Sequence, residues 1–201
     1  MLKRYVVLSL VFLLVPFLVA YSLPQQQEDD RVIKGWLIAK AYDAKGNLLW
    51  THVKEDPFTL NFGRYISLYL EPGAATHSTT KLDGSSGSVK TCYGDCSATD
   101  MLKGAVYIGV GTGTVSFSVN NYQLTSPTWV QASDPSVSII GNKANISVSA
   151  SFSFSSATTI GEVGLRMVTN DADMLIARDV ISKSIPAGGN LAVTWIVEVN
   201  G

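Results

Sequence analysis

Hydrophobic and polar residues alternate over long runs in the second half of the chain. The clearest run is 137–156, in which Ile146, Val148, Ala150, Phe152 and Phe154 are each separated by a single serine. Strict alternation over that length is typical of a strand with one face in a core and the other in water. We therefore predict a half-buried β-strand here.

Similar strand-length segments fill much of the remaining chain. They are 31–42, 48–53, 105–113, 114–119, 159–168, 174–182 and 190–199. Gly46 and Asn47 lie between the first two segments, which we expect to form a β-hairpin because these residue types adopt tight turns. Short strands at this spacing, with almost no helix, predict a mainly β fold, a β-sandwich or jelly-roll-like domain.

One segment departs from this pattern and predicts a single short helix, which begins near Thr59 or Asn61 and ends at about Leu70. Its apolar side chains recur at helical spacing, and a Pro-Gly pair follows it. After the helix, residues 74–98 are rich in Gly, Ser and Thr. Such a composition over that length predicts a long loop.

The two cysteines, Cys92 and Cys96, lie in this loop region with Gly94 between them. On an exported chain, a pair this close favours a small disulfide-closed loop. The alternative is a metal site that includes His77. Two thiols and one distant histidine are a poor set for zinc, which prefers four ligands. We expect neither a metal nor a cofactor.

The N-terminus has the layout of a secretory signal peptide. A basic pair is followed by the apolar run 5–19, and small residues precede Leu23. We predict a signal peptide at 1–22, a flexible leader at 23–31 and a single domain at 32–201. The alternative is a retained anchor, because the apolar stretch approaches the roughly 20 residues that span a bilayer.

Composition and charge exclude some classes of function. The formal net charge is −1, charged residues make up 15% of the chain, and no basic cluster lies beyond the signal. Because a polyanion needs such a cluster, we expect no nucleic-acid partner. We expect contact with the membrane only in transit, through the signal peptide, and a secreted, cell-surface location.

Fragments of several chemical motifs occur, but none is complete. The sequence GVGTGTV at 109–115 lacks the following helix that a dinucleotide site needs. His52 and His77 have no evident acid partner, so no catalytic triad can be identified. Asp171 and Asp173 are more typical of a turn than of a calcium site. We therefore expect no catalytic residues.

Two further features concern structure or modification. Glu162 and Arg166 fall on the same side of one predicted strand, where we expect them to form a structural pair. Asn145 begins an Asn-Ile-Ser sequon, a candidate for N-glycosylation on an exported chain.

The stretch 107–199 resembles a structural module of phage and archaeal-virus tail or virion proteins. The residues that carry the resemblance are Gly109, Gly111, Thr112, Glu162, Gly164, Leu165, Ala177, Arg178 and Trp195. Because the chain also has a signal peptide, its overall plan resembles the secreted filament subunits of archaea, of the thread, bundling-pilus and cannula types. That resemblance implies a β-sandwich that forms a head-to-tail homopolymer by donor-strand complementation.

An N-terminal donor is our specific expectation. Cleavage frees the leader, which is joined to a strand with apolar side chains on both faces: Val32, Ile33, Trp36, Leu37 and Ile38. We expect residues 23–41 to pair with a neighbouring subunit's sheet. The alternatives are that this strand pairs only within its own domain, or that the closing strand 190–199 is the donor. A virus-like tail or adhesin, or a module that binds glycans or surface proteins, is the alternative function.

Overall fold

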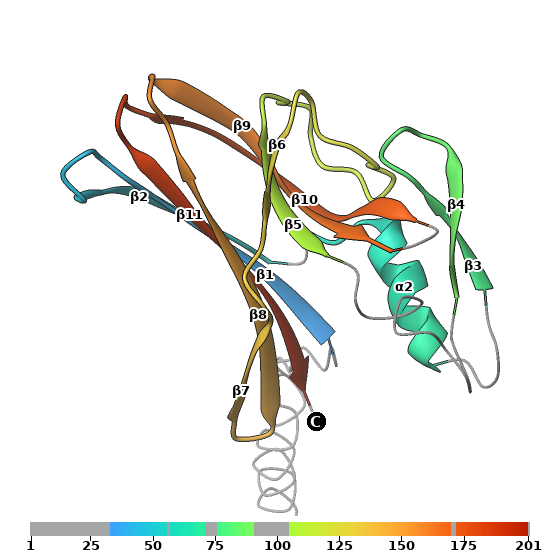
Figure 1. Ribbon diagram of the computed structural model, residues 1–201. Coiled ribbons are helices and arrows are strands. Elements are labelled where there is room, and N and C mark those ends of the chain that lie inside the picture. The colour runs from blue at the N-terminus through green and yellow to red at the C-terminus, as the bar shows by residue number, and fades with distance from the viewer. Residues whose placement is uncertain (1–32, 56, 71–75, 91–104, 170–171, 201) are drawn as a thin grey trace, which may run out of the picture. The chain divides into compact units, whose positions relative to one another are not determined.

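Antiparallel strands form most of the described residues (Figure 1), which confirms the predicted mainly β fold class. The computed structural model describes residues 33–55, 57–70, 76–90, 105–169 and 172–200. They belong to one unit, Val32–Gly201. The predicted signal peptide, the leader and the cysteine pair Cys92 and Cys96 lie outside the described residues.

Sheet A is the larger sheet and has the strand order β2-β1-β11-β8-β7. Its strands are β1 (Ile33–Tyr42), β2 (Leu48–Glu55), β7 (Ser136–Ile140), β8 (Lys143–Ser153) and β11 (Asn190–Asn200). The predicted β1–β2 hairpin is confirmed, and Gly46 has the positive φ of 83° that its turn requires. The alternation in β8 is confirmed too, because Phe152 is buried whereas Ser151 and Ser153 are exposed. The predicted single strand over 137–156 is wrong, because a turn at Gly141 divides this stretch into β7 and β8.

Sheet B has the strand order β10-β9-β5-β6. Its strands are β5 (Val106–Gly111), β6 (Thr128–Gln131), β9 (Thr158–Val168) and β10 (Asp173–Ile185). The predicted strand 114–119 is wrong: this segment belongs to a long loop between β5 and β6. The β9–β10 pairing contains two register shifts, the first between Leu175 and Ala177.

The helix α2 (Leu60–Leu70) confirms the predicted short helix. Beyond it, the prediction of an uninterrupted loop at 74–98 is wrong. Residues of this stretch form a hairpin of β3 (Thr76–Thr80) and β4 (Ser86–Lys90), paired in register. The hairpin was missed because its strands are mostly Ser, Thr and Gly, and so lack the apolar alternation that marks a half-buried strand.

A hydrophobic core lies between sheets A and B. From sheet A it includes Leu37, Ala39, Phe152, Leu191, Val193 and Trp195, and from sheet B Ile108, Val110, Val163, Leu165, Ala177 and Ile181. Phe58, just before α2, stacks on Phe62 with ring centroids 3.7 Å apart. A Cβ at Gly35 of β1 would collide with the Phe58 ring, so glycine allows this close approach. Among the described residues, no helix is long and apolar enough to cross a membrane.

Candidate functional site

A buried ion pair lies on the face of sheet B that faces away from the core. Arg178 Nε donates to Glu162 Oε2 at 2.6 Å, and both side chains are almost completely buried. The Glu162 carboxylate also accepts from the backbone N–H groups of Gly113 and Thr125. Arg178 donates in addition to Asn121 Oδ1 at 3.0 Å and to the Val115 carbonyl at 2.8 Å. The pair therefore holds the β5–β6 loop against the sheet.

Glycines make room for this ion pair. A Cβ at Gly111 or Gly113 would collide with Glu162, and one at Gly161 would collide with the backbone of Thr112 and Gly113. The GVGTG sequence thus packs against a buried carboxylate, an arrangement that has no place for a phosphate group. Gly111, Glu162, Gly164 and Arg178, which carry part of the resemblance to the virion module, all lie in or beside this cluster.

The predicted pair of Glu162 with Arg166 is wrong. Arg166 instead forms a bidentate ion pair with Asp173 across the β9–β10 hairpin, with both N–O distances at 2.6 Å. Its guanidinium also lies over the rings of Tyr107 and Trp129, at 5.0 and 5.5 Å from their centroids. Asp173 is therefore engaged in an ion pair at the start of β10. Asp171 lies outside the described residues.

His52 has an acid partner that sequence analysis missed. Its Nε2 lies 2.6 Å from Asp179 Oδ2, which links β2 of sheet A to β10 of sheet B at one side of the core. Trp50, two residues earlier, donates from Nε1 to the Ser184 carbonyl at 3.0 Å and reinforces the same junction. The partners are 127 residues apart in sequence, so no local motif could have indicated them. His77, by contrast, lies in β3.

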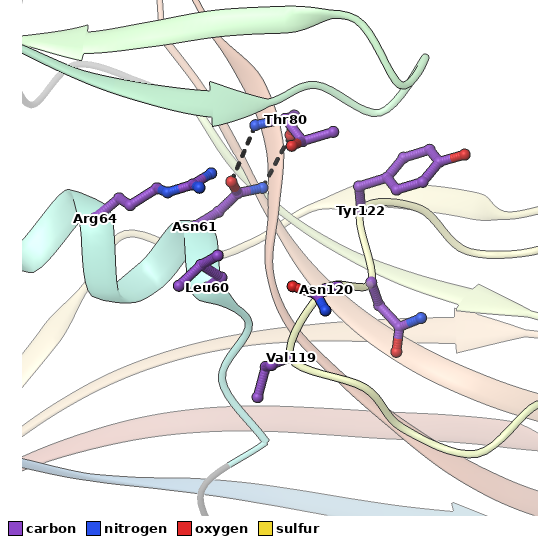
Figure 2. Close-up of a pocket in the computed structure, with 8 residues that line it drawn as sticks. Leu60, Asn61, Arg64, Thr80, Val119, Asn120 and Tyr122 are labelled. Carbon is purple, nitrogen blue, oxygen red and sulfur yellow. Dashed lines mark hydrogen bonds between the residues drawn. The ribbon is translucent and has the colours of Figure 1, made fainter.

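A small pocket of about 130 Å³ lies where α2, β3 and the β5–β6 loop meet (Figure 2). Its lining residues are Leu60, Asn61, Arg64, Thr80, Val119, Asn120, Asn121 and Tyr122. The Asn61 side-chain amide makes three hydrogen bonds within the protein: it donates to the carbonyls of Thr80 and Leu175 and accepts from the Thr80 N–H. Neither histidine lines this pocket. Its walls combine polar side chains, Arg64 among them, with the apolar Leu60 and Val119, so the pocket suits a small molecule that has polar groups.

The described residues contain no group of three or more His, Cys, Asp or Glu side chains placed to hold a metal ion. Asn145, the sequon residue, lies within β8 between Ser138 of β7 and Glu198 of β11. Its side-chain oxygen is buried without a hydrogen-bond partner. A glycan on this residue would stand on the face of sheet A that faces away from the core.

The predicted assembly strand is part of its own sheet. Ile33 to Tyr42 pair with β11, and Trp36 to Tyr42 also pair with β2, so both edges of β1 are occupied. Within this single chain, Ile33, Trp36, Leu37 and Ile38 therefore pair with strands of their own domain, and their role in assembly stays a prediction; Val32 lies outside the described residues. The closing strand β11 is likewise paired on both sides, with β1 and β8.

In the part of the chain that the structure describes, the outer strands of sheet A are β2 and β7, and no further strand pairs with either. Every residue of β7 is exposed, and the exposed fractions of Val137, Ile139 and Ile140 are 63%, 75% and 68%. On β2, Leu48 and Val53 are more than half exposed. Apolar side chains on an open strand edge are uncommon because they invite pairing with another chain.

No protein-family model matches the chain, and no curated protein or solved structure matches it either.

Proposed function

We propose that this protein is an exported structural subunit that forms a filament on the cell surface, with strands of one copy pairing with the sheet of the next. The observation that carries the proposal is the edge strand β7, in which every residue is exposed and Val137, Ile139 and Ile140 are apolar. An edge of this kind presents unpaired backbone N–H and C=O groups beside apolar side chains, which are the features that strand addition uses.

The outer edge of β10 is covered, unlike that of β7, and this difference supports the proposed role of β7. β10 is also the last strand of its sheet, yet its outer edge is covered: Thr59 donates its N–H to the Ile176 carbonyl, and Arg178 donates its N–H to the Pro57 carbonyl. Leu82 donates similarly to the Asp173 carbonyl. The fold thus covers one of the two outer strands of sheet B, β10, whereas β7 is exposed, as expected if β7 binds a partner strand.

The leader, residues 23–31, is the donor that we now propose. β1 cannot leave its sheet without breaking its ladders with β2 and β11. The leader precedes β1 directly, and nine residues in extended form reach about 30 Å. A leader of one copy that pairs with β7 of the next gives a head-to-tail contact, which does not close and so builds a filament.

A catalytic role is not part of the proposal. The His52–Asp179 pair joins the two sheets at the side of the core, and the Glu162–Arg178 pair is saturated with internal hydrogen bonds. Both pairs are accounted for by structural roles. We propose that the partner is a second copy of the same chain, with other surface proteins or glycans as further partners, and that no cofactor takes part.

Electron microscopy of the purified exported chain tests this function. We expect filaments from the native protein and few or none from a Gln25→Pro/Gln27→Pro/Asp29→Pro variant, because proline removes the backbone donors that a ladder needs. The matched control carries alanine at the same three positions and should form normal filaments. Filaments from the proline variant would exclude the leader as donor, and a native protein that never polymerises would exclude the filament.

The pocket of Figure 2 favours one other function, a surface module that binds small polar ligands such as glycan units. Asn120 and Tyr122 on the loop, with Arg64 on α2, are the side chains that would contact such a ligand. A glycan array on the monomeric protein tests it. Specific binding that an Asn120→Ala variant loses, from a protein that never polymerises, would favour this function over the filament.

A further inference from the structure

Sheet B covers only part of the inner face of sheet A, the face that forms the core. Along β8 the inner side chains become progressively more exposed: Phe152 is 5% exposed, Ala150 9%, Val148 is half-buried, and Ile146 is 39% exposed. In Figure 1 the β7–β8 hairpin extends beyond the strands of sheet B. Among the described residues, no second layer covers this end of sheet A.

Apolar side chains line this uncovered end, which we call the overhang. The strand register aligns them in two rows, Val137–Ile146–Val197 and Ile139–Ala144–Val199–Ile33. The other face of β7 and β8 at the same level carries mostly polar side chains, Ser136, Ser138, Lys143 and Asn145, together with the exposed Ile140. Because a sheet face with this composition is normally buried against another layer, the overhang is a candidate contact surface.

A second apolar surface lies on the opposite face of the same sheet, at its opposite edge. Trp36 of β1 is paired with Ile196 of β11, and Ile38 of β1 with Val53 of β2. Val53 is 54% exposed, and the other three are half-buried. We call this surface the Trp36 patch. It explains why β1 has apolar residues on both faces, although only one face contributes to the core.

We propose that the overhang of one copy packs against the Trp36 patch of a second copy, sheet face on sheet face. The inference rests on the proposed function and adds a sheet-face contact to the proposed strand pairing at β7. The leader is joined directly to β1, the central strand of the Trp36 patch. A copy that lends its leader to a neighbour's β7 therefore brings its Trp36 patch close to that neighbour's overhang.

The chain's own leader is a poor cover for the overhang. Its sequence, LPQQQEDDR, has one apolar side chain beyond the proline and carries three acids. It can supply backbone hydrogen bonds but not an apolar layer. The Trp36 patch of a second copy supplies that layer. Because the two surfaces lie on opposite faces of the sheet, two stacked copies make this contact only once, so it is heterologous and continues from copy to copy instead of closing as a symmetric dimer.

The size of the overhang fits a shared contact. Four strands about 4.8 Å apart and about four residues long give roughly 260 Å². A stable interface buries about 800 Å² on each partner. The overhang alone is therefore too small to hold two copies together, and we expect it to act with the strand pairing at β7 in one composite interface.

Two charge insertions test the contact. Ile139→Glu disables the overhang and Val53→Glu disables the Trp36 patch; both side chains are more than half exposed, so the fold should tolerate the changes. Each variant of the exported chain should need an about tenfold higher concentration to polymerise, because a charge enters an apolar contact. The matched controls are Ser138→Glu on the opposite face of β7 and Lys54→Gln on the opposite face of β2, which should polymerise as the native chain does.

Mixing the two variants tests whether the overhang of one copy contacts the Trp36 patch of the other or a second overhang. A mixture has one intact overhang and one intact patch, so sedimentation velocity should detect one-to-one dimers that neither variant forms alone. The inference is wrong if native filaments form and both variants polymerise at the native concentration, a result that leaves the filament itself intact. The inference is also wrong if the mixture forms no dimer. It is wrong as well if the native chain binds lipid vesicles through the overhang, so that Ile139→Glu abolishes vesicle binding but leaves polymerisation unchanged. A native chain that never polymerises overturns both the filament and this contact.

Discussion

Arg178 lies on the same face of sheet B as Glu162 because β10 contains an irregularity at Ile176. Leu175 is paired with Arg166, but Ala177, not Ile176, is paired with Leu165. Since side chains alternate between the faces of a strand, one extra residue moves every later side chain to the other face. Without it, Arg178 would point into the hydrophobic core. Glu162 and Arg166 are four residues apart, so alternation along β9 places them on the same face. Nothing in the sequence indicates the bulge in β10.

The first prediction concerns this ion pair. Glu162→Gln leaves the Arg178 guanidinium buried without its counter-charge, and breaking a buried pair costs about 3–5 kcal/mol of the free energy of unfolding. The control is Glu198→Gln at the Lys143–Glu198 pair, whose lysine side chain is 46% exposed, where about 0–1 kcal/mol is expected. Denaturant unfolding measures both. Equal effects at the two sites would contradict the role given to Glu162.

A glycine pair provides the second prediction. Gly161→Ala should destabilise the fold, because the new Cβ would collide with backbone atoms of Thr112 and Gly113 that cannot move freely. Gly63→Ala, in α2, meets nothing within 4 Å, and it should stabilise the protein by up to about 1 kcal/mol, the helix-propensity difference between the two residues. Thermal unfolding of the two variants should therefore shift in opposite directions, and a shared direction would be evidence against the packing described.

The third prediction concerns pH. The Asn47 side chain and the backbone N–H groups of Asn47 and Lys45 donate to Asp43 in the β1–β2 turn and hold its pKa below the ordinary value of 3.8. A lowered folded-state pKa means that the turn is stabilised above pH 3.8 and loses this stabilisation as pH falls through the folded pKa. An NMR titration should find the Asp43 midpoint below 3.8, and Asn47→Ala should raise it. A midpoint that Asn47→Ala leaves unchanged would show that the side-chain hydrogen bond is not the main cause.

At the scale of elements, local patterns predicted much of the fold. The β1–β2 hairpin, α2 and β8 each follow from turn residues or apolar spacing within a few residues. The β3–β4 hairpin had one local signal, the Asp83-Gly84 dipeptide, and Gly84 does take the positive φ of 82°. That signal was overlooked because the flanking strands are polar.

Pairings between distant strands were beyond such patterns. β1 reads from its sequence as a strand with two apolar faces, and this property fits a donated strand as well as an internal one. Only its register with β2 and β11 separates the two possibilities. The His52–Asp179 contact likewise depends on how β2 and β10 approach each other across the core. Sequence spacing contains neither fact.

The fourth prediction follows from the central place of β1. Deleting residues 23–31 should leave the domain folded and weaken assembly, because only the proposed donor is lost. Deleting residues 23–41 should unfold the domain, because it removes the strand between β2 and β11 and the buried side chains of Leu37 and Ala39. Far-UV circular dichroism with thermal unfolding separates the two results. A longer deletion that still folds would mean that β1 is dispensable to its own sheet.

At the scale of the whole molecule, the two sheets differ in how completely they are protected. Sheet B has one outer strand, β10, whose edge is covered, and a loop fixed on its outer face by Glu162 and Arg178. Sheet A has an open apolar edge at β7 and apolar side chains on parts of both faces. Exposed apolar surfaces of this kind are uncommon in monomeric proteins. They are expected in the proposed polymer subunit, because its contact surfaces become buried only on assembly.

The most direct test is a cryo-electron microscopy reconstruction of the assembled exported chain. We predict a filament in which an additional strand, the leader of a neighbouring copy, pairs with β7 along Ser136–Ile140, and in which β1 keeps its pairing with β2 and β11. A reconstruction in which β7 remains exposed to solvent while copies meet elsewhere would contradict the account, as would exported protein that stays monomeric at every concentration.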